Sequence, residues 1–150
     1  MNYSNTKIYK IWSTKGDKIY IGATTKKYLS QRMTAHRKMY NSWKNTNAHY
    51  TTSYILFEEY DIKNCFIELL EAKECKDKHE QAQLEGKYIR ELECINKNIP
   101  DRTTIEYYND NRETILKKAV EYRQNHKEAI SIKRKELYKL KKPPFCNITE

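Results

Sequence analysis

The large apolar residues of this chain are concentrated before residue 100, and this distribution limits the chain to one modest core. Of its 150 residues, 38% are hydrophobic and 33% are charged, which is polar for a globular protein. After Pro100 large aliphatic residues become sparse, and Asn, Arg, Lys and Tyr dominate. We therefore expect one domain over residues 1–100 and a thinner appendage over residues 101–150.

The first residues predict a β-hairpin. Residues 7–12 and 18–21 are rich in β-branched and aromatic side chains, and the segment between them contains Gly16, which suits a turn position with positive φ. Side chains alternate across a strand, so Tyr9 and Tyr20 should emerge on one face of the sheet if they lie opposite or nearly opposite each other.

Apolar and aromatic side chains recur at helical spacing over residues 28–43, which predicts a helix. Arg32 and His36 are four residues apart in this segment, so they should lie on one side of the helix, one turn from each other. Residues 54–60 predict a second, short helix, and residues 66–70 predict a third strand.

A later helix should begin after Asp77, because Asp77 and Glu80 have the spacing of a capping box, and it should run to about Cys94. Its apolar positions fit a half-buried helix, with Glu85 directly beside the apolar Leu84. A carboxylate so close to the core is partly desolvated or has a partner. A surface glutamate that merely flanks the core is the alternative.

The residues after 100 predict a basic helical tail. Residues 108–115 and 122–130 look like imperfect copies of each other, with a period of roughly 14 to 16 residues. Asp110 and Glu113 have the spacing of a further capping box. Residues 115–142 contain ten basic and three acidic residues, which gives this segment a net charge of +7.

The formal net charge of the whole chain is +9, so its surface should attract polyanions, and nucleic acid is the first candidate partner. A solvated, Lys-rich face without specific contacts is the alternative. If the tail does follow a phosphate backbone, we expect the contacts to come from Lys117, Lys118, Arg123, Lys127, Lys133, Arg134 and Lys135.

The cysteines show no CxxC pairing, and no apolar run near the start suits a signal peptide, so we expect an intracellular, reducing compartment (cytoplasm or nucleus) and no secretion. Cys75, His79 and Cys94 could be written as a zinc site, but isolated core thiols are the simpler interpretation. No segment approaches the roughly 20 apolar residues needed to span a bilayer, so no membrane partner is expected.

The predicted hairpin carries two tripeptides, Lys7-Ile8-Tyr9 and Tyr20-Ile21-Gly22, with ten residues between the tyrosines. The two longer helices add Leu29, Arg32, His36, Glu85 and Tyr88-Ile89. In this order, over about residues 7–100, the chain resembles the GIY-YIG nuclease family. Lys7 stands where the family name has glycine, at a place where a strand tolerates an outward side chain.

The resemblance implies an α/β (α+β) fold, in which a small three-stranded antiparallel sheet is flanked by helices and followed by the helical basic tail. Residues 1–100 would form the nuclease domain, and residues 101–150 would form a DNA-binding arm. The asparagine that the family often carries after its last helix matches either Asn96 or Asn98.

The resemblance also implies a metal-dependent endonuclease that hydrolyses phosphodiester bonds in DNA, one strand per active site. Glu85 would ligate one Mg²⁺ or Mn²⁺ ion, because magnesium prefers oxygen ligands, and a single strong carboxylate disfavours a two-metal site. The implied catalytic residues are Tyr9, Tyr20, Arg32, His36 and Glu85.

In the family the first tyrosine is the usual general base, here Tyr9, with Tyr20 and His36 assisting, while Arg32 would stabilise phosphate charge. A phenol has a pKa near 10, so Tyr9 needs a neighbour that favours its phenolate or a proton relay. No small-molecule substrate is expected, and two copies could pair on DNA to cut both strands. The alternative function is a non-catalytic DNA- or RNA-binding module on the same fold.

Overall fold

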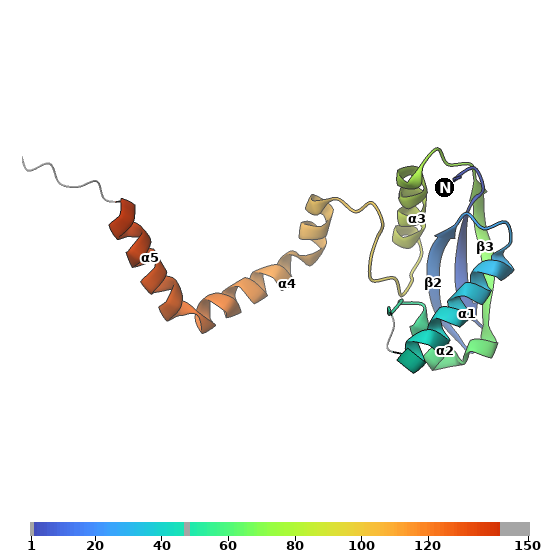
Figure 1. The fold of residues 1–150 in the computed structure, drawn as a ribbon, viewed down its shortest axis with the longest axis horizontal. Coiled ribbons are helices and arrows are strands. Elements are labelled where there is room, and N and C mark those ends of the chain that lie inside the picture. Colours follow the sequence, from blue (N-terminus) through green and yellow to red (C-terminus); the bar gives the residue numbers. More distant parts are fainter. Residues whose placement is uncertain (1, 47–48, 142–150) are drawn as a thin grey trace, which may run out of the picture. The chain divides into compact units, whose positions relative to one another are not determined.

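The computed structural model describes residues 2–46 and 49–141 and divides the chain into two compact units, Met1–Arg102 and Thr103–Glu150 (Figure 1). The first unit contains a three-stranded antiparallel sheet with the strand order β2-β1-β3 and helices on both faces. This architecture confirms the predicted sheet with flanking helices.

The central strand β1 (Thr6–Ser13) pairs with β2 (Gly16–Thr24) and with β3 (Cys65–Lys73). The expectation of a positive φ at Gly16 was wrong, because Gly16 pairs with Ser13 as the first residue of β2, and no glycine among the described residues has a positive φ. Gly16 instead leaves room for the Tyr60 phenol, whose end a Cβ atom at this position would overlap.

Helices α1 (Leu29–Thr46) and α2 (Tyr54–Tyr60) cover one face of the sheet. A short 3-10 helix, η1 (Ile62–Asn64), connects α2 to β3. The buried core of this face consists of Tyr9, Ile11, Met33, Tyr40, Tyr54, Leu56, Phe57 and Cys65.

Helix α3 (Lys78–Glu91) covers the other face, where Leu84 and Ile89 pack on Ile8 and Ile21. Asp77 caps the helix as predicted, since its Oδ1 accepts the amide of Glu80 at 2.9 Å. The second half of the predicted capping box differs.

The Glu80 carboxylate accepts the amide of Lys76 at 2.9 Å, one residue before the cap, so it does not bond the N-cap amide itself. The helix also stops earlier than the expected end near Cys94, because the chain turns away after Glu91 to pair with β2.

The second unit consists of two helices, α4 (Thr104–Asn125) and α5 (Lys127–Lys141), with a break at His126. The capping box lies at Thr103 and Glu106, so its predicted place at Asp110 and Glu113 was wrong: both residues lie inside α4.

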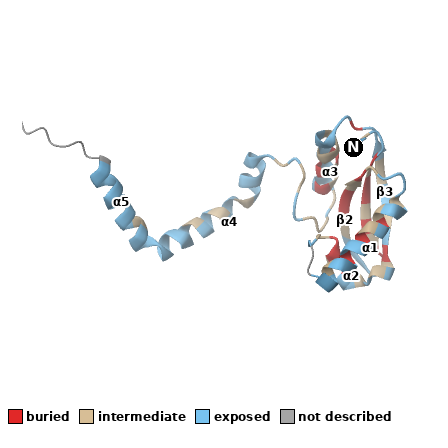
Figure 2. Cartoon of the chain, in the orientation of Figure 1, coloured by how far each residue is buried: buried red, intermediate tan, exposed pale blue. Residues whose placement is uncertain are grey.

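No residue of α4 is buried, and Figure 2 shows α4 and α5 as exposed over most of their length. Among the described helices, none combines the length and the apolar character of a membrane-spanning segment.

Cys65, Cys75 and Cys94 are free thiols, and Cys146 lies outside the described residues. His79 Nδ1 lies 2.9 Å from Asp101 Oδ1, and the described residues contain no group of three or more His, Cys, Asp or Glu side chains that could hold a metal ion. The zinc alternative therefore has no support in the described part of the chain.

Candidate active site

Tyr9 occupies the centre of the sheet and is fully buried. Its partner across β1 and β2 is Gly22, while Tyr20 pairs with Ile11, two positions away on the same face. A Cβ atom at position 22 would lie 2.5 Å from Tyr9 Oη and 3.2 Å from Tyr20 Cε1. The Tyr9 phenol can therefore cross over β2 only because residue 22 is glycine.

Helix α1 presents Arg32 and His36 to this phenol from one side, as their spacing of four predicts. Arg32 Nε donates a hydrogen bond to Tyr9 Oη at 2.8 Å. His36 Nε2 lies 2.8 Å from the same oxygen, and its ring also meets the ring of Tyr20 edge-on at 5.8 Å between centroids. One phenolic oxygen thus joins the guanidinium and the imidazole.

Burial determines the protonation of these groups. It raises the pKa of Tyr9 to about 12, although the nearby Arg32 guanidinium opposes the shift, and it also raises the pKa of Tyr20 above its ordinary value. Burial, together with the positive charge of Arg32, lowers the pKa of His36 to about 3. Near neutral pH both phenols keep their protons and the imidazole is neutral.

Glu85 approaches from α3, at the edge of the sheet formed by β2. The backbone amide of Ala23 donates to its carboxylate, and Arg32 is close enough to favour its charged form. Burial outweighs both effects and raises the pKa of Glu85 to about 7. The structure therefore brings all five predicted residues together, from β1, β2, α1 and α3.

The segment after α3 holds the edge of β2. Ile95 donates its amide to the carbonyl of Ile19 at 2.9 Å. The amide side chain of Asn96 bonds both backbone groups of Ile21, accepting from its N–H and donating to its C=O, each at 2.8 Å. Of the two asparagines left open by the sequence, Asn96 is the one that holds the Tyr20–Gly22 strand.

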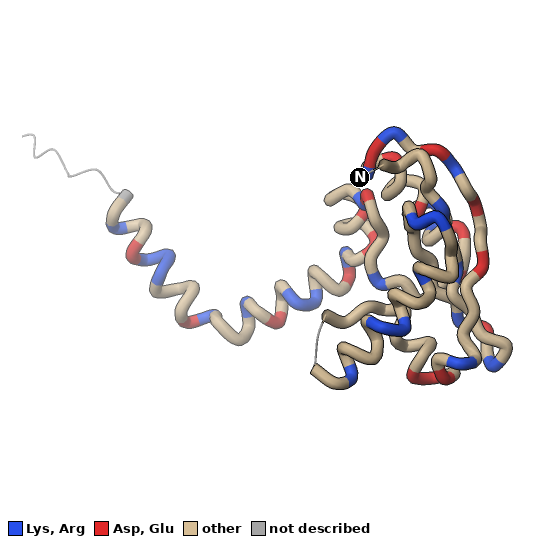
Figure 3. Tube along the Cα trace, turned by 45° about the vertical axis from the view of Figure 1, so that its right-hand side comes forward, with Lys and Arg blue, Asp and Glu red and all other residues tan. Residues whose placement is uncertain are grey.

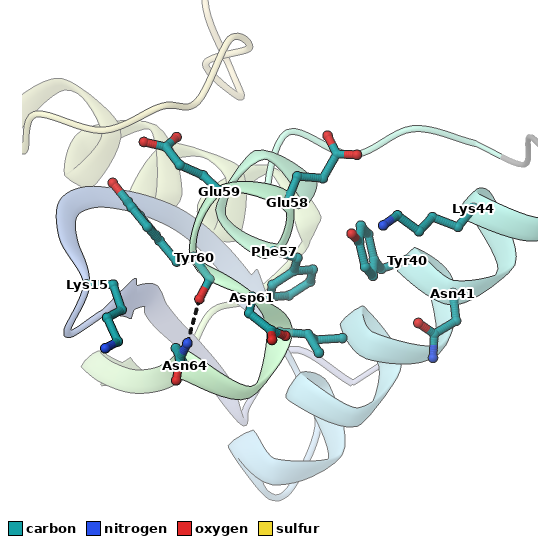
Figure 4. A pocket seen from close by; sticks show the side chains of 11 residues that line it. Lys15, Tyr40, Asn41, Lys44, Phe57, Glu58, Glu59, Tyr60, Asp61 and Asn64 are labelled. Atoms are coloured by element: carbon teal, nitrogen blue, oxygen red, sulfur yellow. Dashed lines mark hydrogen bonds between the residues drawn. The ribbon is translucent and has the colours of Figure 1, made fainter.

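A cavity of about 250 Å³ opens beside Tyr20 and Glu85. Thr51, Asn96 and Asn98 are among its other lining residues, so the cavity is largely polar. A larger groove of about 900 Å³ lies elsewhere, between α1, α2 and η1, and Figure 4 shows the carbonyl of Tyr60 accepting from Asn64 on its wall. This groove contains none of the five predicted residues, so size alone does not locate the site.

The donor set suits one magnesium-like ion. Glu85 is a half-buried carboxylate that lines an open polar cavity, and a nearby cation would offset its desolvation. Magnesium is commonly held by one or two carboxylates together with waters and substrate phosphate oxygens, so one protein ligand is sufficient. The residues present therefore fit the expected metal.

The comparison with protein families agrees with this geometry. The family model of the GIY-YIG catalytic domain matches residues 5–98, which is more than half of the chain. The chain belongs to the GIY-YIG family. Its GIY-YIG domain places it among nucleases, which in this family generally use divalent metal ions. No curated protein and no solved structure matches the chain significantly.

The departure of this GIY-YIG chain at Lys7 is accommodated at the surface. The Lys7 ammonium bonds the Asn5 side chain and the carbonyl of Lys26, the latter at 3.3 Å. The side chain is directed outward, as expected, and takes no part in the contacts of Tyr9.

Sequence reasoning missed Ser53 and Gly22 as parts of the site. Ser53 is fully buried, and its Oγ lies 3.2 Å from His36 Nδ1. The signal for Gly22 was present, since a glycine inside a strand marks a close approach of another group. For Ser53 the only signal was a serine before a short apolar helix, which ordinarily indicates a cap.

In the second unit the structure gathers part of the predicted basic set. Arg123, Lys127, Arg134 and Lys135 line one cavity of about 390 Å³ where α4 meets α5. Lys117, Lys118 and Lys133 do not line it. Figure 3 shows Lys and Arg positions recurring along both helices.

Proposed function

We propose that this GIY-YIG protein is a metal-dependent endonuclease that hydrolyses phosphodiester bonds in DNA, one strand per active site. The observation that supports this most directly is the double hydrogen bonding of Tyr9 Oη to Arg32 and His36, with the Glu85 carboxylate close by. A buried tyrosine with a purely structural role needs only one hydrogen-bond partner for its hydroxyl group.

Arg32 is suited to hold the scissile phosphate. Its Nε is bonded to Tyr9, which fixes the plane of the guanidinium and leaves the N–H groups of its two terminal nitrogens for non-bridging phosphate oxygens. Its positive charge would be most favourable in the transition state, where negative charge on those oxygens increases.

Glu85 would hold the divalent ion. When bound, such an ion supplies charge stabilisation to the phosphate and lowers the pKa of a coordinated water. The contribution of the chain is a carboxylate that the Ala23 amide orients and that Arg32 keeps from being fully protonated at neutral pH.

Tyr9 and His36 would move the proton of the attacking water. The water oxygen forms a bond to phosphorus, its proton passes to Tyr9 Oη, and the phenolic proton passes to His36 Nε2 at 2.8 Å. The bond from phosphorus to the 3′ oxygen breaks, and that oxygen leaves with the electron pair and takes a proton from solvent. A relay avoids a free phenolate, which burial disfavours because it raises the pKa of this phenol to about 12. His36 would hold the relayed proton only transiently, because burial and the charge of Arg32 lower its pKa to about 3.

Tyr20 has a different place in the proposal. It lines the same polar cavity as Glu85, and its half-buried phenol keeps its proton at neutral pH because burial raises its pKa. We assign it to donate a hydrogen bond to the phosphate or to the leaving oxygen.

The basic tail would add affinity for the DNA backbone. The four cations that line the cavity between α4 and α5 form a local concentration of positive charge, which is the feature that phosphate contacts require. Since one site handles one strand, a cut through both strands would need two copies or two binding events.

Plasmid nicking with Mg²⁺ or Mn²⁺ tests the proposal. Wild type should nick, while Arg32→Ala and Glu85→Ala should lose about 10²-fold or more in rate and still bind DNA. Lys38→Ala on α1 and Glu91→Ala on α3 are matched controls, since both side chains are exposed, and they should nick at the wild-type rate. Equal nicking by all variants would place the chemistry elsewhere.

A non-catalytic DNA- or RNA-binding role is favoured by one observation: Tyr9 has no exposed surface in the free protein, so a covering side chain must move before water reaches it. In that case wild type would bind nucleic acid with either metal ion and cut none of it. Nicking that depends on Arg32 and Glu85 would exclude this alternative.

A further inference from the structure

Ser53 stands at the N-cap of α2 but makes no capping hydrogen bond with its side chain. A serine at this position ordinarily accepts a backbone amide of the first turn, an interaction worth about 1 kcal/mol. Here the hydroxyl lies against His36 instead, 3.2 Å from Nδ1, and the residue is fully buried. The amides of Tyr54, Ile55 and Leu56 instead donate to the backbone carbonyls of Thr51, Thr52 and Ser53. The helix therefore needs no side-chain cap, and the Ser53 hydroxyl is left for the imidazole.

The hydrogen-bond partners of Tyr9 determine where the proton of His36 resides. The phenol keeps its proton at neutral pH, and a fully buried O–H needs an acceptor. Arg32 Nε can only donate, so the phenol donates to His36 Nε2. Nε2 must then be the nitrogen without a proton. A neutral His36 therefore carries its proton on Nδ1. This N–H donates a hydrogen bond to Ser53 Oγ.

We infer that Ser53 is a positioning residue that holds His36 in its Nδ1–H tautomer and thereby keeps Nε2 open to the phenolic proton of Tyr9. The effect on catalysis rests on the proposed function. The tautomer itself does not, because it is a property of the protein without DNA. Without the Ser53 hydroxyl, Nδ1–H would lose its acceptor inside the core. The opposite tautomer would direct Nε2–H at Tyr9 Oη and close the path for the phenolic proton.

The tautomer can be measured by ¹⁵N NMR of the histidine rings in the full-length, DNA-free protein, with the His36 signals assigned from a His36→Gln sample. In wild type Nε2 should have the chemical shift of an unprotonated ring nitrogen, and Nδ1 that of a protonated one. In Ser53→Ala the two shifts should move toward each other as both tautomers become populated. Ser53→Thr keeps the hydroxyl and should restore the wild-type pattern.

Kinetics supply the second readout. Ser53→Ala should lower kcat for nicking about tenfold and leave KM unchanged. A tenfold loss is smaller than the roughly 10²-fold or more that general acid–base catalysis contributes to a rate. Ser13→Ala is the matched control, because Ser13 is also buried but its Oγ donates to the carbonyl of Asn64. This variant should leave both the tautomer and kcat unchanged.

A protonated Nε2 in the wild-type spectrum would overturn the inference, and so would a Ser53→Ala spectrum identical to wild type. The wild-type spectrum can still overturn the inference if Ser53→Ala fails to fold. If wild type shows the expected tautomer and Ser53→Ala loses it, but wild type nicks no DNA, the proposed function fails and the assignment of Ser53 stands. If wild type nicks with Nε2 protonated, the inference fails together with the proton relay through His36, and the assignment as an endonuclease stands.

Discussion

Gly22 determines how closely the Tyr9 phenol can approach β2. In Gly22→Ala the new methyl group would lie 2.5 Å from Tyr9 Oη, so the phenol must shift away from Arg32 and His36. We expect nicking to fall by about 10²-fold and stability by about 1–3 kcal/mol. Plasmid nicking and urea unfolding measure the two effects.

Gly16→Ala is the matched control for this substitution, since its methyl group would also meet a tyrosine ring, but that of Tyr60. This variant should lose stability while each folded molecule nicks at the wild-type rate. If both alanine variants lost activity in proportion to their stability alone, the close approach over Gly22 would have no specific role in catalysis.

The raised pKa of Glu85 should appear as a pH-dependent stability. Folding raises this pKa from 4.5 to about 7, so the folded protein binds the proton more tightly than the unfolded chain. The associated stability is complete below about pH 4.5 and is lost as the pH rises through about 7. Glu85→Gln should therefore exceed wild type in stability above pH 7, by about 2 kcal/mol after allowance for partial exposure.

Urea unfolding at a series of pH values, with a metal chelator present, measures this difference. The curves of wild type and Glu85→Gln should converge near pH 4.5 and separate as the pH rises. Curves that stay parallel from pH 4 to pH 8 would show that the Glu85 carboxylate is not desolvated.

The residues of the site were predictable to different degrees. Arg32 and His36 could be paired from the sequence because a helix turns once in about four residues. The contact of Ser53 with His36 and that of Asn96 with Ile21 join residues 17 and 75 positions apart. No local pattern encodes either, so only the folded chain reveals them.

Asn96 stabilises β2 at its open edge by acting as a short stretch of a neighbouring strand. Asn96→Ala would leave the N–H and C=O of Ile21 without their partner and should cost about 1–3 kcal/mol, moderated where water can replace the amide. Hydrogen exchange at the Ile21 amide should accelerate more than exchange at the β1 amides. Nicking should fall as well, because Tyr20 and Gly22 flank this residue.

Asn98→Ala provides the comparison, as Asn98 is exposed and lines the same cavity as Tyr20. Its stability should remain within about 0.5 kcal/mol of wild type. A similar loss in the two variants would argue against a specific role of the Asn96 side chain.

The helices and strands themselves followed mainly from periodicity, and their ends from capping. Helix α2 was predicted over its observed residues because aromatic and aliphatic side chains dominate it, and Asp77 marked the start of α3 correctly. Asp110 failed as a cap because Thr103 already starts α4 seven residues earlier. Residue spacing alone cannot decide between two candidate N-caps when the residues between them form a helix that has no buried face, because no apolar pattern then marks where the helix begins.

The tail should govern affinity and leave the chemistry unchanged. A chain that ends at Arg102 should keep the unfolding free energy of the first unit, because no residue of α4 is buried. Its KM for DNA should rise, and the slope of log K against log salt should flatten, since each lost phosphate contact removes about 0.9 from that slope. Binding and nicking over a range of salt concentrations test this.

A second variant separates the effect of the tail's charge from that of its length. It keeps the full chain and changes four cations to Gln: Arg123, Lys127, Arg134 and Lys135. It should reproduce most of the change in slope, with kcat close to wild type. A slope equal to that of wild type in both proteins would remove the tail from the DNA interface.

A helix without buried side chains tolerates most substitutions without a loss of stability. Substitutions along α4 disturb no interior packing, whereas those around Tyr9 meet groups a few ångströms away on every side. If the tail binds DNA as proposed, the segment that finds the target can therefore change in sequence more readily than the segment to which we assign the reaction.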